Sequence, residues 1–145
     1  MRGFLSLILT AVLLAGCQTA GDGLTGGAAP TPVTGPAAST IAGDMASRLA
    51  EQIGPAGNTT IKMNKESSEF ATALEAALKG WGYAVVTDQT VEKGTKAIEL
   101  AYSIDSVDGR VLARLSTPPI ALGRAYTTTA TGAVPASPLS VMRRD

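Results

Sequence analysis

The sequence predicts a small single α+β domain, in which two helices pack on a mostly antiparallel sheet of about five strands. Residues 41–53 and 70–81 each carry apolar side chains at the spacing of an amphipathic helix. Residues 98–104 instead alternate apolar and polar side chains, as a strand with one buried face does. Asp108-Gly109 is a dipeptide that favours a hairpin turn. The chain of 145 residues has room for one such domain.

The first helix is predicted from an apolar residue at every fourth position. Ser39 or Thr40 can cap its N-terminus, and Gly54-Pro55 is a typical stop. The repeating residues, which should face the core, are Ile41, Met45, Leu49 and Ile53.

The second helix lies between two short strands. Ser67 or Ser68 can cap it, a strand is predicted over 59–63 before it, and a buried strand over 83–87 follows it. Its apolar side should consist of Phe70, Ala73, Leu74, Ala77, Leu78 and Trp81.

The remaining strands form a meander. After the turn at Asp108-Gly109 a strand returns over 110–115, and Pro118-Pro119 ends it because proline cannot donate to a ladder. A last strand is predicted over 120–130, with Tyr126 buried and Gly123 as a candidate bulge. From about residue 131, Pro135 and Pro138 favour an extended C-terminal tail.

The composition excludes several functions. The chain has 12 basic and 12 acidic residues, which argues against direct nucleic-acid binding. It has no histidine and one cysteine, so the commonest general base and metal ligand is missing and no disulfide can form within the chain. No catalytic residue, cofactor site or metal site is predicted, and the chain is not expected to be an enzyme.

The N-terminus predicts a lipoprotein signal peptide over residues 1–16. Arg2 precedes an apolar stretch over 4–14, which is shorter than the roughly 20 residues of a membrane-spanning helix. The sequence Leu14-Ala15-Gly16-Cys17 is typical of a lipobox, in which cleavage falls between Gly16 and Cys17 and the thiol receives a covalent lipid. The alternative is an ordinary secretory signal with an incidental cysteine.

Residues 17–38 are predicted to be the lipidated cysteine and a disordered tether, followed by a periplasmic domain over 39–145. Gly, Pro, Ala and Thr dominate the tether, which cannot bury enough surface to fold alone. Gln18 after the cysteine favours the outer membrane, with the domain facing the periplasm. Leu24 and Val33 are candidate contacts if the tether orders on a partner.

Other motifs have a functional and a structural interpretation. Asp105 and Asp108 could form a carboxylate pair, but aspartate is common at turns. Residues 65–69 could hold a Ser/Lys nucleophile pair, but a helix cap explains them better. Trp81 and Phe70 could bind a ligand, although their helical spacing favours the core. Two candidate contacts to a partner or to lipid head groups remain, Arg143 and Arg144.

Three segments resemble the conjugal transfer protein TrbH family of plasmid type IV secretion systems. They are residues 41–55, which read IAGDMASRLAEQIGP, residues 73–88, and the closing stretch over 122–143. The resemblance implies a structural lipoprotein of the mating-pair formation channel. It also implies partners similar to the core components TrbG and TrbI, within a multimeric ring. Only Cys17 carries over from the family as a functional position.

Three hypotheses follow from the sequence. The first is a structural, outer-membrane lipoprotein of a conjugation channel. The second is a periplasmic lipoprotein module that binds a small ligand or a cell-envelope component and has no part in transfer. The third is a hydrolase, which the missing histidine and the missing nucleophile motif disfavour.

Overall fold

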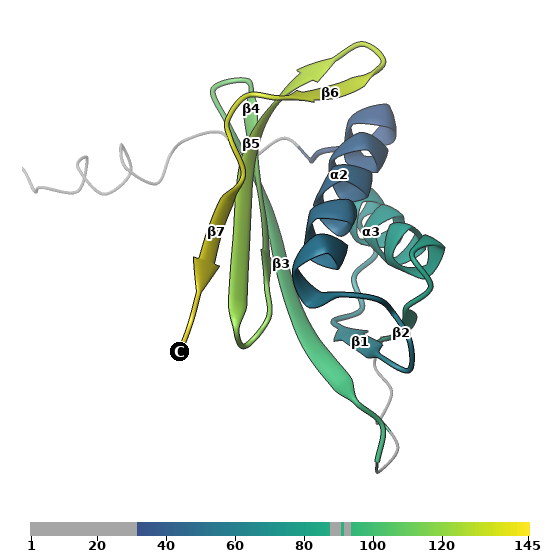
Figure 1. Ribbon diagram of the computed structural model, residues 1–145. Coiled ribbons are helices and arrows are strands. Elements are labelled where there is room, and N and C mark those ends of the chain that lie inside the picture. The colour runs from purple at the N-terminus through teal and green to yellow at the C-terminus, as the bar shows by residue number, and fades with distance from the viewer. Residues whose placement is uncertain (1–31, 88–90, 92–93) are drawn as a thin grey trace, which may run out of the picture.

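Two helices cover one face of a mixed sheet of seven strands, so the predicted fold class is confirmed (Figure 1). The structure is a computed structural model that describes residues 32–87, 91 and 94–145. The sheet order is β2-β1-β3-β4-β5-β6, and β7 also pairs with β5. The elements are α2 (Gly35–Ile53), β1 (Thr60–Met63), α3 (Glu69–Gly80), β2 (Ala84–Thr87), β3 (Ala97–Val107), β4 (Arg110–Ser116), β5 (Ile120–Thr129), β6 (Gly132–Pro135) and β7 (Ser140–Arg143).

Helix α2 is the central element of the core. The predicted residues Ile41, Met45 and Leu49 are fully buried, because their spacing places them on one face of the helix. The helix begins at Gly35, however, and not at the predicted cap Ser39-Thr40. Proline is favoured in the first helical turn, where Pro36 lies, and Ala38 is buried against the sheet, so packing extends the helix toward the N-terminus.

Helix α3 begins at one of its two predicted caps, since the Ser68 Oγ accepts a hydrogen bond of 3.1 Å from the Ala71 amide. Phe70, Leu74 and Leu78 are buried as predicted. Trp81 is not part of this apolar side, because the helix ends one residue before it and its side chain is 52% exposed.

Tyr83, two residues after Trp81, is buried. Gly82 has a φ of 95°, which only glycine adopts readily, and this turn directs the next ring inward. The Tyr83 hydroxyl donates a hydrogen bond to the Gly54 carbonyl at the end of α2. The turn after α3 is therefore fastened to the end of α2.

Helix α3 connects two parallel strands, β1 and β2. β1 pairs in parallel with β2 on one side and with β3 on the other. The strand predicted over 83–87 forms as β2, but the prediction that this strand is buried is wrong. β2 is a sheet edge with an exposed first residue, because nothing among the described residues pairs with its outer side.

Strands β3, β4 and β5 form the predicted antiparallel meander. The turn between β3 and β4 has positive φ at both Asp108 (50°) and Gly109 (74°), as a two-residue hairpin turn requires. Tyr126 is buried as predicted. Gly123 is not a bulge, because the pairing of β4 with β5 runs without interruption from Ser116 to Arg110.

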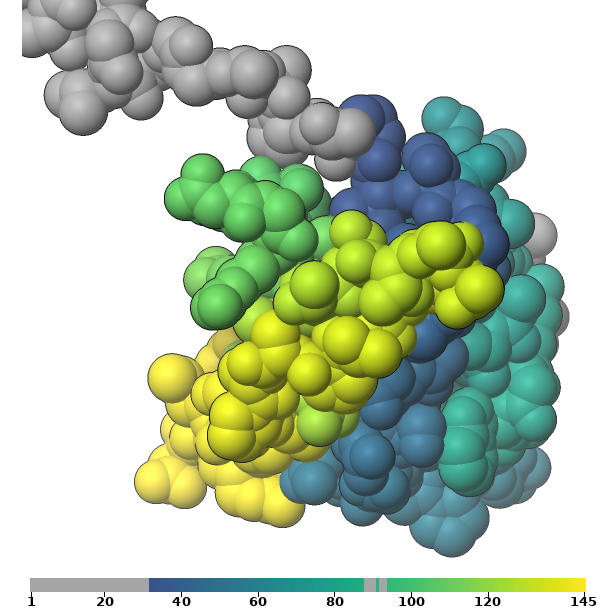
Figure 2. All heavy atoms as spheres, turned by 90° about the horizontal axis from the view of Figure 1, so that it is seen from above, coloured from purple at the N-terminus to yellow at the C-terminus, as the bar shows by residue number. Residues whose placement is uncertain are grey.

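The predicted C-terminal tail is instead part of the sheet. β6 pairs with one end of β5 and β7 pairs with the other end. The two prolines of this region fall outside the β7 ladder or at the end of β6, so they do not prevent pairing. Figure 2 shows the segment around β6 lying against α2, with α3 on the far side of that helix.

One glycine allows the close contact between β6 and α2. A Cβ atom at Gly132 would lie 2.6 Å from the Thr40 Oγ1, which is closer than real side chains approach. That hydroxyl is held in place by a hydrogen bond of 2.8 Å to the Pro36 carbonyl. Any larger residue at position 132 would therefore press against the first turns of α2.

Candidate anchoring and partner-binding residues

The predicted lipid anchor lies outside the described residues. Gly16, Cys17 and Leu24 all precede residue 32, so the lipidation site, the cleavage site and one of the candidate partner contacts stay predictions. None of the described helices is long and apolar enough to cross a membrane.

Val33 lies within the predicted tether, two residues before α2 begins. Its side chain is partly buried and packs against the core. It also lines a cavity of about 590 Å³ between the starts of α2 and α3 and the middle of β3. The Gly35 amide donates a hydrogen bond to the Glu69 carboxylate in the first turn of α3, which holds the two helix starts together. The chain therefore enters the domain at a fixed point.

Arg143 and Arg144 are exposed, but both bind other parts of the chain. Arg143 Nη2 donates to the Gln52 Oε1 on α2 at 2.9 Å. Arg144 Nη2 donates to the Ser116 Oγ at 2.7 Å, and its Nη1 donates to the Thr117 carbonyl at 3.3 Å. In this structure the two arginines thus hold the C-terminal strand against α2 and against the end of β4.

A polar cluster around Asp44 was missed by sequence reasoning, which gave this residue no role. The Asp44 Oδ2 accepts from the Tyr126 hydroxyl at 2.6 Å and from Arg124 Nη1 at 3.0 Å. Arg124 Nε in turn donates to the Ser137 carbonyl at 3.1 Å. The cluster ties α2, β5 and the segment between β6 and β7 together. No local sequence pattern could have revealed this cluster, because Asp44 and Tyr126 are 82 positions apart in the sequence.

Burial raises the pKa of all three tyrosines, and the shift is large for Tyr102 and Tyr126. Burial, followed by the nearby Glu66 carboxylate, raises the pKa of Tyr102 to about 12. The pKa of Tyr126 is raised further by burial and by its hydrogen bond to the Asp44 carboxylate, which favours the neutral phenol. Neither hydroxyl is poised for proton transfer near neutral pH.

The sequence motifs with an alternative catalytic interpretation have structural roles. Asp108 forms the hairpin turn, while Asp105 lies in β3 opposite Leu112. In the 65–69 motif, Ser68 caps α3. Phe70 packs in the core, where its ring centroid lies 6.2 Å from that of Tyr102. Among residues 32–87, 91 and 94–145, no three acidic or sulfur side chains come together as a metal site would require.

Comparisons with known proteins agree over nearly the whole chain. Residues 19–145 match the family described as conjugal transfer protein TrbH. A protein of Sinorhizobium fredii (strain NBRC 101917 / NGR234), named "Probable conjugal transfer protein TrbH", is 69% identical over 148 residues, which cover 100% of each chain. No solved structure matches the chain. On the strength of the family match and of this relative, the chain belongs to the TrbH family of conjugal transfer proteins.

Proposed function

We propose that this chain is an outer-membrane lipoprotein that acts as a structural and assembly component of a conjugal type IV secretion channel. The observation that carries the proposal is the family match over residues 19–145, together with a relative named as a probable conjugal transfer protein. The lipobox at residues 14–17 adds the anchor. In this proposal the chain works by holding other proteins, and it catalyses no reaction.

The build of the domain supports a holding role. Its part-buried polar contacts, such as the Asp44 cluster, join elements to one another. Both ends of the described chain are fastened, the N-terminal end through Gly35 and Glu69 and the C-terminal end through Arg144. A domain fixed at both ends keeps its surfaces in a defined geometry, which an assembly component needs.

The lipid supplies the membrane attachment in this proposal. A single short acyl chain holds a protein only marginally, whereas two or more chains give stable anchoring. A diacylglycerol on the Cys17 thiol and an acyl group on its amine would meet that condition. The proposed partners are the TrbG-like and TrbI-like core components, arranged with this chain in a multimeric ring.

Replacing the lipidated residue tests the proposal. In cells that carry the transfer genes, Cys17→Ser should abolish palmitate labelling, release the protein from the outer-membrane fraction and lower plasmid transfer by about tenfold or more. Thr19→Ser is the matched control and should leave all three readouts unchanged. Full transfer by a Cys17→Ser protein that carries no lipid would contradict the anchoring role.

A further inference from the structure

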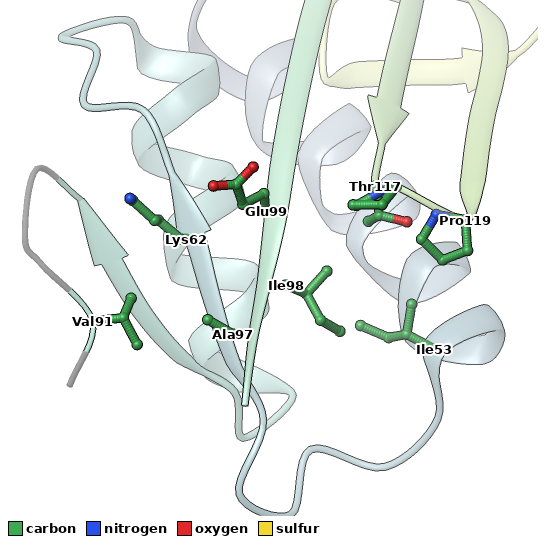
Figure 3. A pocket seen from close by; sticks show the side chains of 9 residues that line it. Ile53, Lys62, Val91, Ala97, Ile98, Glu99, Thr117 and Pro119 are labelled. Carbon is green, nitrogen blue, oxygen red and sulfur yellow. The ribbon is translucent and has the colours of Figure 1, made fainter. Parts of the chain in front are cut away.

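One end of β3 has a neighbouring strand on one side only. β1 lies along Ala97–Leu100 on one edge, while β4 lies along Ala101–Val107 on the other. β4 ends at Ser116, and Figure 3 shows the next residue, Thr117, well short of the level of Ala97. The edge of Ala97–Leu100 that faces away from β1 therefore has no strand beside it within the part of the chain that the structure describes.

The free edge presents backbone groups that a ladder could use. The Thr60 amide donates to the Lys96 carbonyl at 2.9 Å, and Thr60 lies opposite Ala97. Because successive residues of a strand direct their N–H and C=O groups to opposite sides, Lys96 and Ile98 face β1. Ala97 and Glu99 consequently direct theirs toward the open edge. Such an edge is a template for pairing with another chain.

A groove runs along this edge, with a volume of about 640 Å³. Figure 3 shows the side chains of Ile53 and Ile98 pointing toward one another across it, with Pro119 close by. The turn formed by Pro118-Pro119 closes one end, and its prolines prevent the hairpin of β4 and β5 from extending into the groove. The groove thus combines an apolar wall with an open strand edge.

We propose that this groove binds an extended segment of a partner protein, which adds to the sheet as a strand beside Ala97–Leu100. Pairing of this kind takes its affinity from main-chain hydrogen bonds and its specificity from alternate side chains. On the helix side, the segment needs a branched apolar residue to contact Ile53 and Ile98. On the opposite face, it needs a basic or hydroxyl residue beside the exposed Glu99 carboxylate.

The short length of the edge favours an extended segment over a second folded copy of this chain. Only Ala97 and Glu99 direct groups to it, so two copies pairing here would share a short ladder. Stable interfaces between folded proteins bury about 1,200 Å² or more. A single segment, by contrast, would contact the strand edge, the apolar wall and the proline turn at once. This proposal rests on the proposed function, because it assumes that the chain acts by binding other proteins.

Hydrogen exchange gives the first test. The assembly is isolated through a tag on the full lipidated chain, and exchange at single residues is compared with that of the same chain purified alone. In the chain alone, the Ala97 and Glu99 amides should exchange faster than the Ile98 and Leu100 amides, which pair with β1. In the assembly, the exchange rates of the Ala97 and Glu99 amides should fall by about tenfold or more. Equal exchange at Ala97 and Glu99 in the two samples would overturn the proposal.

A proline at the first residue of β3 gives the second test. Ala97→Pro removes an outward N–H and blocks pairing, while leaving the bonds to β1 intact. It should lower plasmid transfer about tenfold, whereas Ala97→Val, which keeps the N–H, should transfer normally. Glu99→Gln removes the exposed carboxylate without placing a second positive charge opposite Lys62 of β1, and it should also lower transfer. Normal transfer by both Ala97→Pro and Glu99→Gln would overturn the proposal.

The two proposals fail in different ways. If Cys17→Ser transfers normally while Ala97 and Glu99 are protected in the assembly, the anchoring role fails and the groove stands. If Cys17→Ser abolishes transfer while those amides exchange freely, the groove fails alone. A dimer of the purified chain in sedimentation that Ala97→Pro abolishes would show that a second copy fills the groove, which overturns the proposed occupant.

Discussion

The two halves of this domain are built in different ways, and they meet on β3. In the first half, β1 and β2 are parallel strands of four residues each, joined through α3. In the second half, β4 to β7 are antiparallel, run up to ten residues and follow one another through short connections. Parallel neighbours require a crossover, whereas antiparallel neighbours need only a turn. The stability of the first half therefore depends more on the packing of its helices than on the hydrogen bonds between its strands.

Helix α2 is the element that contacts both halves. It packs against α3 on one side and against β4, β5 and β6 on the other. A short parallel unit with an edge strand has little core of its own, so the buried face of α2 completes it. The two halves should therefore unfold as one cooperative unit, despite their different construction.

Large core truncations give the strongest test of that single unit. Phe70→Ala in the first half should cost about 3–5 kcal/mol and Leu122→Ala in the second about 2–5 kcal/mol, since both side chains are fully buried. Urea unfolding should show one transition for each variant, followed equally by the fluorescence of Trp81 and by circular dichroism. Two separate transitions would show that the two halves unfold independently.

The Asp44 cluster gives the next largest effect, and it is confined to the contact between α2 and the second half. Asp44→Asn should destabilise the domain by about 1–3 kcal/mol, because Arg124 loses its charge partner and the Tyr126 hydroxyl loses a charged acceptor. Tyr126→Phe is the matched variant that removes one hydrogen bond, and it should cost about 1 kcal/mol. Equal stability of Asp44→Asn and the wild type in urea would show that the cluster adds nothing to this contact.

A larger side chain at Gly132 tests the contact between β6 and α2. Gly132→Ala should cost about 1 kcal/mol, because the added methyl group meets the Thr40 Oγ1 and outweighs the usual gain from replacing glycine in a strand. In a Thr40→Ala background the same change should be neutral or stabilising. Thermal unfolding of the four proteins of this double-mutant cycle measures the coupling. A zero coupling energy would show that β6 does not press on α2.

The pH dependence gives the smallest effect and reports on β3, the strand on which the two halves meet. Tyrosine in an unfolded chain has a pKa of about 10, and in the folded chain the pKa of Tyr102 is raised to about 12. A raised pKa favours the neutral form, so this stability is fully present below pH 10 and is lost as the pH rises toward 12. Tyr102→Phe should make this loss of the free energy of unfolding smaller, as measured by urea unfolding between pH 10 and 12. A loss unchanged in that variant would place its origin elsewhere.

The sequence predicted those features that depend on local patterns. The alternation along 98–104 and the dipeptide Asp108-Gly109 each determine their own local geometry, and both are confirmed. β6 and β7 were missed because each has only four residues and each forms by pairing with β5, which no local pattern reveals. Trp81 was misplaced because helical spacing was extended past the residue where the helix ends.

The candidate functional residues also divide into those that a local sequence pattern indicates and those that depend on the folded structure. The lipidation of Cys17 stays a prediction, which rests on a few neighbouring residues of the sequence. The open edge of β3 could not be predicted, since it exists only because β4 stops at Ser116 while β3 begins earlier along the sheet. The bonds made by Arg143 and Arg144 likewise depend on where β7 lies.

The entry point of the chain beside α2 has a mechanical consequence. Figure 1 shows that the described chain begins at one end of α2 and ends beyond β7 at the other end of the sheet. With the N-terminal side attached to a membrane, tension would reach the domain at the first turn of α2. One face of α2 is buried from Ala38 to Leu49, so a force along the helix axis acts on all the contacts of that face at once, in shear. Such a force does not separate the strands of the sheet one by one. The domain would then bear load without opening its edge.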